Sequence, residues 1–148
     1  MSFTAQLDAE RIVAAVAAAE RKSSGEIRVH VTQRKPENIE ERARQRFELL
    51  GMTKTAERNG VLLYIAPRAR RFQILGDIGI HEKCGPDFWR EVADEIEAHF
   101  RKGEFTDGIV RAVEHVGEVL ARHFPRSQGD RDELPNALDL EHEEPGKP

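Results

Sequence analysis

The sequence predicts an α/β protein, a three-layer α/β/α sandwich that is Rossmann-like and contains a small mixed sheet. Its 148 residues, 39% of them hydrophobic, make up about one domain with one core. Short strand-length segments alternate with longer segments of helical spacing, in the order α-β-α-β-β-α-α. A strand-helix-strand crossover is nearly always right-handed, so the first two strands should be parallel and the third should return as a C-terminal β-hairpin strand.

The first half of the chain is predicted to be a helix, a strand and a helix. Residues 5–22 repeat apolar side chains at helical spacing, and the sequence SSG at 23–25 ends the pattern. Residues 26–32 alternate polar and β-branched side chains, as a strand does. Residues 37–50 return to helical spacing, and Gly51 can end this second helix.

The second half is predicted to form a hairpin and two helices. Residues 60–66 are an unbroken apolar run, which is typical of a strand covered on both faces, and residues 71–76 are its hairpin partner. A third helix is expected over 86–102, with a proline at its first position. Thr106 caps a fourth helix, which Pro125 ends.

Charge divides the chain into a domain, expected over residues 4–125, and an acidic tail. Residues 126–148 carry seven acidic and three basic side chains, which accounts for the whole net charge of −4. Apolar residues are sparse in this tail, so we expect it to be largely disordered. The rest of the chain is neutral, with 20 residues of each sign, and this argues against nucleic acid as a partner.

Features that the sequence lacks argue against a membrane span, a nucleotide cofactor and secretion. With 34% charged residues and no long apolar run, no membrane span is expected. No glycine-rich phosphate loop follows the first strand, which argues against a nucleotide cofactor. The first residues do not resemble a secretory signal, so we expect a cytoplasmic protein, unless a signal has been removed. Cys84 is the single cysteine and is expected to be a small buried side chain, while His30 should face solvent or a helix edge.

Four motifs, in this order and spacing, resemble the TPM domain family, named in part after thylakoid lumen proteins with acid phosphatase activity. They are SGEIRV at 24–29, RNGVLLY at 58–64, RRFQILGDIGI at 70–80 and FTDGI at 105–109, within a match of about 8–125. The chain is similar to the soluble bacterial branch, because it has no membrane anchor or glycine-rich tail. The resemblance implies a Rossmann-like α/β/α sandwich, a crevice that binds divalent cations, and phosphatase activity in some members.

The predicted topology gathers oxygen ligands at one end of the sheet. Glu26 begins the first strand, Asn59 precedes the second and Asp77 follows the third, while His81 and Glu82 should hang over the same edge. Carboxylate and amide oxygens suit a hard cation, so calcium is predicted first, with magnesium as an alternative. A nearby imidazole would also admit manganese or zinc. Each of these residues taken alone also fits an ordinary turn or strand-edge role.

The opposite end of the sheet is predicted to be basic. Its loop residues are Thr32, Gln33, Arg34, Lys35, Arg68, Arg70 and Arg71. In open α/β sheets ligands usually enter at the carboxyl ends of parallel strands, which would be this end. We place the metal at the acidic end because cations need anionic oxygens, and we interpret the arginines as solvated hairpin charges.

Two functions remain open at this stage. One is a divalent-cation-binding domain that is non-catalytic, or a cation-tuned protein-interaction module with a protein partner. The other is a metal-assisted phosphomonoesterase, similar to an acid phosphatase, in which the cation activates water and His81 is a general acid.

Overall fold

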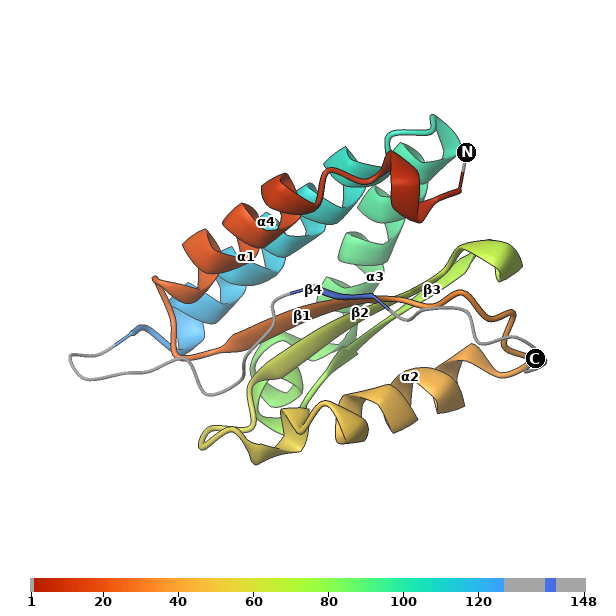
Figure 1. Ribbon diagram of the computed structural model, residues 1–148. Coiled ribbons are helices and arrows are strands. Elements are labelled where there is room, and N and C mark those ends of the chain that lie inside the picture. Colours follow the sequence, from red (N-terminus) through yellow and green to blue (C-terminus); the bar gives the residue numbers. More distant parts are fainter. Residues whose placement is uncertain (1, 127–137, 141–148) are drawn as a thin grey trace.

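The chain folds into a mixed α/β structure, as predicted (Figure 1). A computed structural model describes residues 2–126 and 138–140. The helices are α1 (Ala9–Glu20), α2 (Ile39–Leu49), α3 (Ile78–Arg101) and α4 (Phe105–His123), with short 3-10 turns η1 (Thr4–Gln6), η2 (Met52–Lys54) and η3 (Pro67–Ala69). The strands are β1 (Glu26–Val31), β2 (Gly60–Ala66), β3 (Arg71–Gly76) and β4 (Leu138–Leu140).

The sheet has the strand order β3-β2-β1-β4. β1 and β2 are parallel, with Glu26 opposite Gly60, and β3 runs antiparallel to β2, as the crossover argument predicts. β4 is parallel to β1, and its last residue, Leu140, lies opposite Val31. The amino ends of β1 and β2 therefore lie together at one end of the sheet, which we call its amino edge, and their carboxyl ends lie together at the opposite end.

Helices cover both faces of the sheet (Figure 1). α1, α3 and α4 pack on one face in a core that includes Ile27, Val29 and Val31 of β1. On the other face α2 packs against Leu62 and Tyr64 of β2. All seven residues of β2 are buried, as its unbroken apolar sequence predicts.

Helix α3 begins earlier than predicted. The proline signal at residue 86 marks only its second segment, because the helix starts at Ile78 and is interrupted at Gly85, where φ is 73°. Asp77 caps the first segment, since its Oδ1 accepts a hydrogen bond of 2.8 Å from the Ile78 N–H. The expected loop after Gly76 is therefore a helical turn.

Strand β4 was not predicted at all. It pairs with residues 29–31 of β1, and Leu138 packs against the main core. Of the predicted acidic tail, the structure describes Arg126 and residues 138–140, and the other residues lie outside the described ranges. The disorder of the tail and the limits of the domain therefore stay predictions. Within the described ranges, no helix is long and apolar enough to span a bilayer.

Candidate functional site

The amino edge of β1 and β2 is where four separate segments of the chain meet. The loop before β1 is tied to the end of α4, because the Ser24 N–H donates to the Phe124 carbonyl over 2.9 Å. The loop before β2 is tied to the start of α3, because the Gly79 N–H donates to the Arg58 carbonyl over 2.8 Å. The Asp77 N–H donates to the Gly60 carbonyl over 2.9 Å. These backbone hydrogen bonds hold the loops, which carry the polar side chains, in fixed positions relative to one another.

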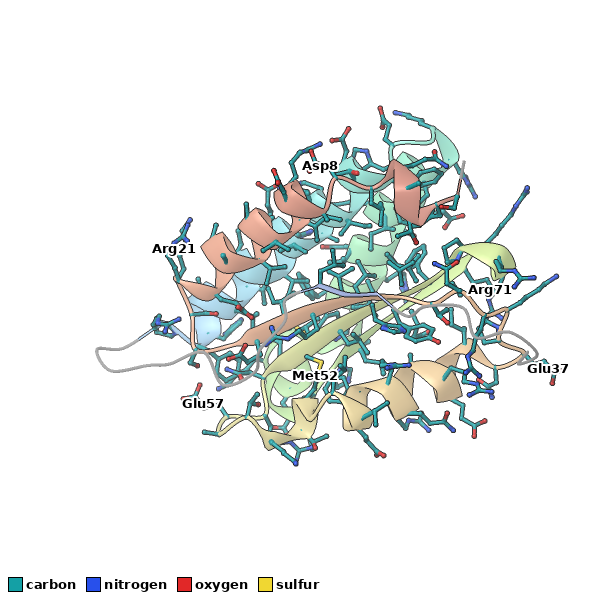
Figure 2. The ribbon with its side chains drawn as sticks, viewed as in Figure 1. Asp8, Arg21, Glu37, Met52, Glu57 and Arg71 are labelled. Atoms are coloured by element: carbon teal, nitrogen blue, oxygen red, sulfur yellow. The ribbon has the colours of Figure 1, made fainter. Side chains whose placement is uncertain are left out.

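Ser24, Glu57 and Asn59 form a connected cluster at this edge, which we call the amino-edge cluster. The Ser24 hydroxyl donates to Glu57 Oε2 over 2.6 Å. The Asn59 side-chain nitrogen donates to Ser24 Oγ over 3.1 Å and to Glu57 Oε2 over 3.4 Å. Glu57 is exposed, and Figure 2 shows it at the end of the sheet opposite Arg71.

The amide oxygen of Asn59 is the least satisfied atom of the cluster. Asn59 is 1% exposed, and its Oδ1 is buried without a hydrogen-bond donor among the residues that the structure describes. Without a cation the amide cannot simply be turned over, because its oxygen would then face the Glu57 carboxylate. A buried carbonyl oxygen without a partner costs about 1–3 kcal/mol, so a cation or a water molecule at Oδ1 would be stabilising.

Asp77 lies at the same edge but is engaged by other groups. Arg58 binds it with two parallel hydrogen bonds, Nε to Oδ2 over 2.6 Å and Nη2 to Oδ1 over 2.8 Å. Its Oδ1 also caps α3. The hydrogen bond and the charge of Asp77 raise the pKa of Arg58 above its ordinary value. Asp77 thus holds the loop before β2 against α3, in a geometry typical of a structural ion pair.

Gly79 allows the close contact between α3 and the loop before β2. A Cβ atom at this position would lie 2.1 Å from the Glu57 carbonyl oxygen and 2.6 Å from that of Arg58. Backbone atoms cannot yield as a flexible side chain can. The glycine is therefore required by the close approach of the two segments, and it positions Glu57 indirectly.

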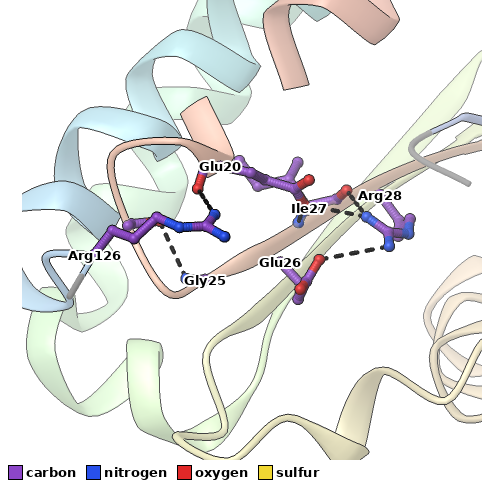
Figure 3. A network of polar contacts seen from close by, with 7 residues as sticks. Glu20, Gly25, Glu26, Ile27, Arg28 and Arg126 are labelled. Atoms are coloured by element: carbon purple, nitrogen blue, oxygen red, sulfur yellow. Dashed lines mark hydrogen bonds and ion pairs between the residues drawn. The ribbon is translucent and has the colours of Figure 1, made fainter. Parts of the chain in front are cut away.

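Glu26 belongs to a separate, buried network with Glu20 and Arg28 (Figure 3). Arg28 Nη1 lies 3.1 Å from Glu20 Oε2, and its Nη2 lies 3.5 Å from Glu26 Oε2. Glu20 Oε2 also accepts a hydrogen bond of 2.8 Å from the Ile27 N–H. Arg126 donates to the Glu20 carbonyl over 2.7 Å, which links the chain after α4 to the end of α1. Glu26 is thus committed to an ion pair with Arg28.

His81 and Glu82 lie on the exposed first turns of α3. The His81 Nδ1 accepts a hydrogen bond of 3.1 Å from the Trp89 indole. In the described part of the chain, no three side chains of His, Cys, Asp or Glu form a group that could hold a metal ion. The five predicted ligands thus share an end of the sheet without forming such a group, and their individual roles stay predictions.

The spacing of Cys84 and Arg90, a Cys-x5-Arg signature of cysteine phosphatases, was overlooked in the sequence. Such chemistry needs a thiolate held by a loop of backbone N–H groups. Here partial burial raises the pKa of Cys84, which keeps the thiol protonated at neutral pH. Four of the five intervening residues, 86–89, belong to the second helical segment of α3, and Arg90 faces Asp87 at 3.6 Å on the surface. The arrangement is not that of a cysteine nucleophile.

Two residues of the amino-edge cluster, Ser24 and Glu57, were missed as site residues. Ser24 begins the SGEIRV motif, and Glu57 stands two residues before Asn59. Their proximity depends on a contact between segments 33 residues apart, which spacing alone does not reveal. His30, expected at a solvent-facing or helix-edge position, is fully buried and stacks on Tyr64 with ring centroids 5.1 Å apart.

Comparison with known proteins identifies the family. The TPM domain profile matches residues 3–119. The chain is similar to the BA42 protein of the psychrophilic bacterium Bizionia argentinensis, with 39% identity, coverage of 91% of this chain and 95% of that one, and a TM-score of 0.83.

Two other solved structures share the fold at lower identity. The N-terminal domain of a P. gingivalis protein has 22% identity, coverage of 80% and 79%, and a TM-score of 0.65. The N-terminal domain of cg2496 from Corynebacterium glutamicum has 18% identity, coverage of 80% and 76%, and a TM-score of 0.58. No match is found among curated proteins. The profile match and the 39% identity over nearly the whole chain show that this protein belongs to the TPM domain family.

Proposed function

We propose that this chain is a divalent-cation-binding TPM domain that acts as a cation-tuned protein-interaction module. The observation that carries the proposal is the buried Asn59 Oδ1, which lacks a donor among the described residues and belongs to the same cluster as the Glu57 carboxylate. The helices on both faces of the sheet support assignment to the three-layer, Rossmann-like class.

The donor set fits a hard cation. Glu57 would supply a carboxylate and Ser24 a hydroxyl oxygen. The Asn59 amide nitrogen faces these two side chains, so the amide would turn over when a cation binds and would present Oδ1 to it, because the cation then lies between Oδ1 and the carboxylate. Water would complete the six to eight ligands that calcium takes. One negative charge among three protein donors predicts weak binding, in the millimolar range. This set keeps Asn59 from the sequence prediction and adds two residues. Glu26 and Asp77 then act as structural neighbours of the site, because arginines already neutralise them.

The position of the cluster explains how a bound cation would change the affinity for a protein partner. The cluster joins the loops before β1 and β2, and these loops are tied to α4 and α3. A cation bound there would add a bond between the two loops and would reduce their freedom to move apart. A partner that contacts both loops would then bind more tightly in the presence of the cation.

Thermal and calorimetric titration with calcium, magnesium, manganese and zinc tests the proposal. Glu57→Gln keeps an oxygen that can accept the Ser24 hydrogen bond but removes the charge, so calcium affinity should fall at least tenfold. Glu40→Gln, an exposed glutamate on α2, is the matched control and should bind like the wild type. At a hundredfold excess over Kd, the cation should stabilise the wild type by roughly 2.7 kcal/mol.

Other outcomes separate the alternatives. If Glu82→Gln abolishes binding and Glu57→Gln does not, the ligands lie on α3, near His81. If no cation at 10 mM, about ten times the expected millimolar Kd, shifts the melting temperature, the proposed site is wrong. Hydrolysis of p-nitrophenyl phosphate that requires a cation, stops with EDTA and is lost in Glu57→Gln would establish the phosphomonoesterase instead.

A further inference from the structure

The carboxyl ends of β1 and β2 form a basic edge, opposite the candidate cation site. Two loops meet there, because Arg68 Nη1 donates to the Gln33 carbonyl over 3.2 Å. Figure 2 shows Arg71 at this end of the sheet, far from Glu57. The edge is defined by the basic side chains that follow β1 or join β2 to β3, which are Arg34, Lys35, Arg68, Arg70 and Arg71.

The charges of this edge are largely accessible. Lys35 and the three arginines of the β2–β3 connection are exposed, and Arg34 is half-buried. Arg70 adopts a left-handed backbone conformation, with φ of 53°, at the end of η3. This conformation is uncommon for a residue with a side chain. Glu37 and the first-turn glutamates of α2 reduce the positive charge but do not outnumber it.

Strand β4 brings an acidic sequence to the same edge. It runs parallel to β1, and Leu140 pairs with Val31, the last residue before the basic loop. β4 therefore ends level with β1, at the carboxyl ends of the parallel strands. The sequence that follows is EHEE at 141–144, with three glutamates in four residues.

We propose that the basic edge is a docking surface for acidic polypeptide, and that the chain's own segment 141–144 is its occupant. Charge complementarity and the position of β4, directly before this segment, both support this occupant. A segment held at the surface has a millimolar effective concentration, so weak exposed ion pairs are sufficient for it to compete with a free ligand. An external acidic partner would then have to displace the segment. The inference is independent of the cation proposal, because it concerns the other edge.

The test uses the full-length chain in EDTA and a fluorescein-labelled octamer of glutamate as the probe. The variant E141Q/E143Q/E144Q removes three charges after β4. The variant D130N/D132N/E133Q removes three charges before β4 and is the matched control, because that segment reaches β4 from its amino end. The first variant should bind the probe on the order of fivefold more tightly than the control, and 0.5 M NaCl should abolish the difference.

Backbone and arginine-side-chain NMR locates the contact. The resonances of residues 33–35 and 68–71 should shift between the wild type and E141Q/E143Q/E144Q but not in the control. Equal probe affinity of both variants, with unchanged resonances, would overturn the proposal. Differences that grow with protein concentration would place a second copy on the edge and would also overturn it. Arg68→Glu should weaken probe binding in every background, and an unchanged affinity would show that the probe binds elsewhere.

Discussion

Asp77 shows how one side chain at the candidate site can serve the fold. It caps α3 and binds Arg58 with both oxygens. Asp77→Ala should lower the free energy of unfolding by about 0.5–2 kcal/mol through the lost cap alone. Asp77→Asn keeps an oxygen for the cap and should retain most of that stability. Urea denaturation in EDTA measures both effects. Equal losses in the two variants would show that the ion pair with Arg58, rather than the cap, stabilises this edge.

Gly79 sets the distance between two elements, helix α3 and the loop before β2, so a substitution there should change how they pack. Gly79→Ala would place a Cβ against two carbonyl oxygens, so the loop or the helix must move, at a cost of about 1–3 kcal/mol. It should also weaken calcium binding, although it removes no ligand. Urea denaturation and calorimetry measure the two effects. Glu82→Ala, on the next turn of α3, is the control and should change neither. Unchanged calcium affinity in Gly79→Ala would separate the cation site from this contact.

The elements also show which features the sequence could predict. Apolar periodicity located the helices and the first three strands because it reports burial, and the crossover rule gave their directions. The start of α3 was missed because a strong proline signal eight residues later drew the boundary there, while the cap at Asp77 looked like an exit turn. The network of Glu20, Glu26 and Arg28 was missed because buried charges follow a polar pattern that normally indicates solvent.

At the scale of the whole molecule, the sheet separates two edges of different charge. The amino edge holds the cluster of Ser24, Glu57 and Asn59, and the basic edge holds the exposed arginines. Sequence reasoning placed Asn59 and these arginines at opposite ends because the direction of each strand followed from its connections. It did not predict β4, since three residues with two leucines give too short a pattern, and pairing with β1 is a long-range effect.

Two shortened chains test how far the stable unit extends. A chain that ends at Leu140 keeps β4 and should unfold close to the wild-type midpoint. A chain that ends at Arg126 loses the packing of Leu138 and the hydrogen bonds to β1, and should be less stable by about 1–3 kcal/mol. It also exposes the outer edge of β1, so it should self-associate in sedimentation experiments. Identical unfolding midpoints and a monomeric shorter chain would show that β4 contributes nothing to the fold and that the stable unit ends near residue 125, as the sequence predicts.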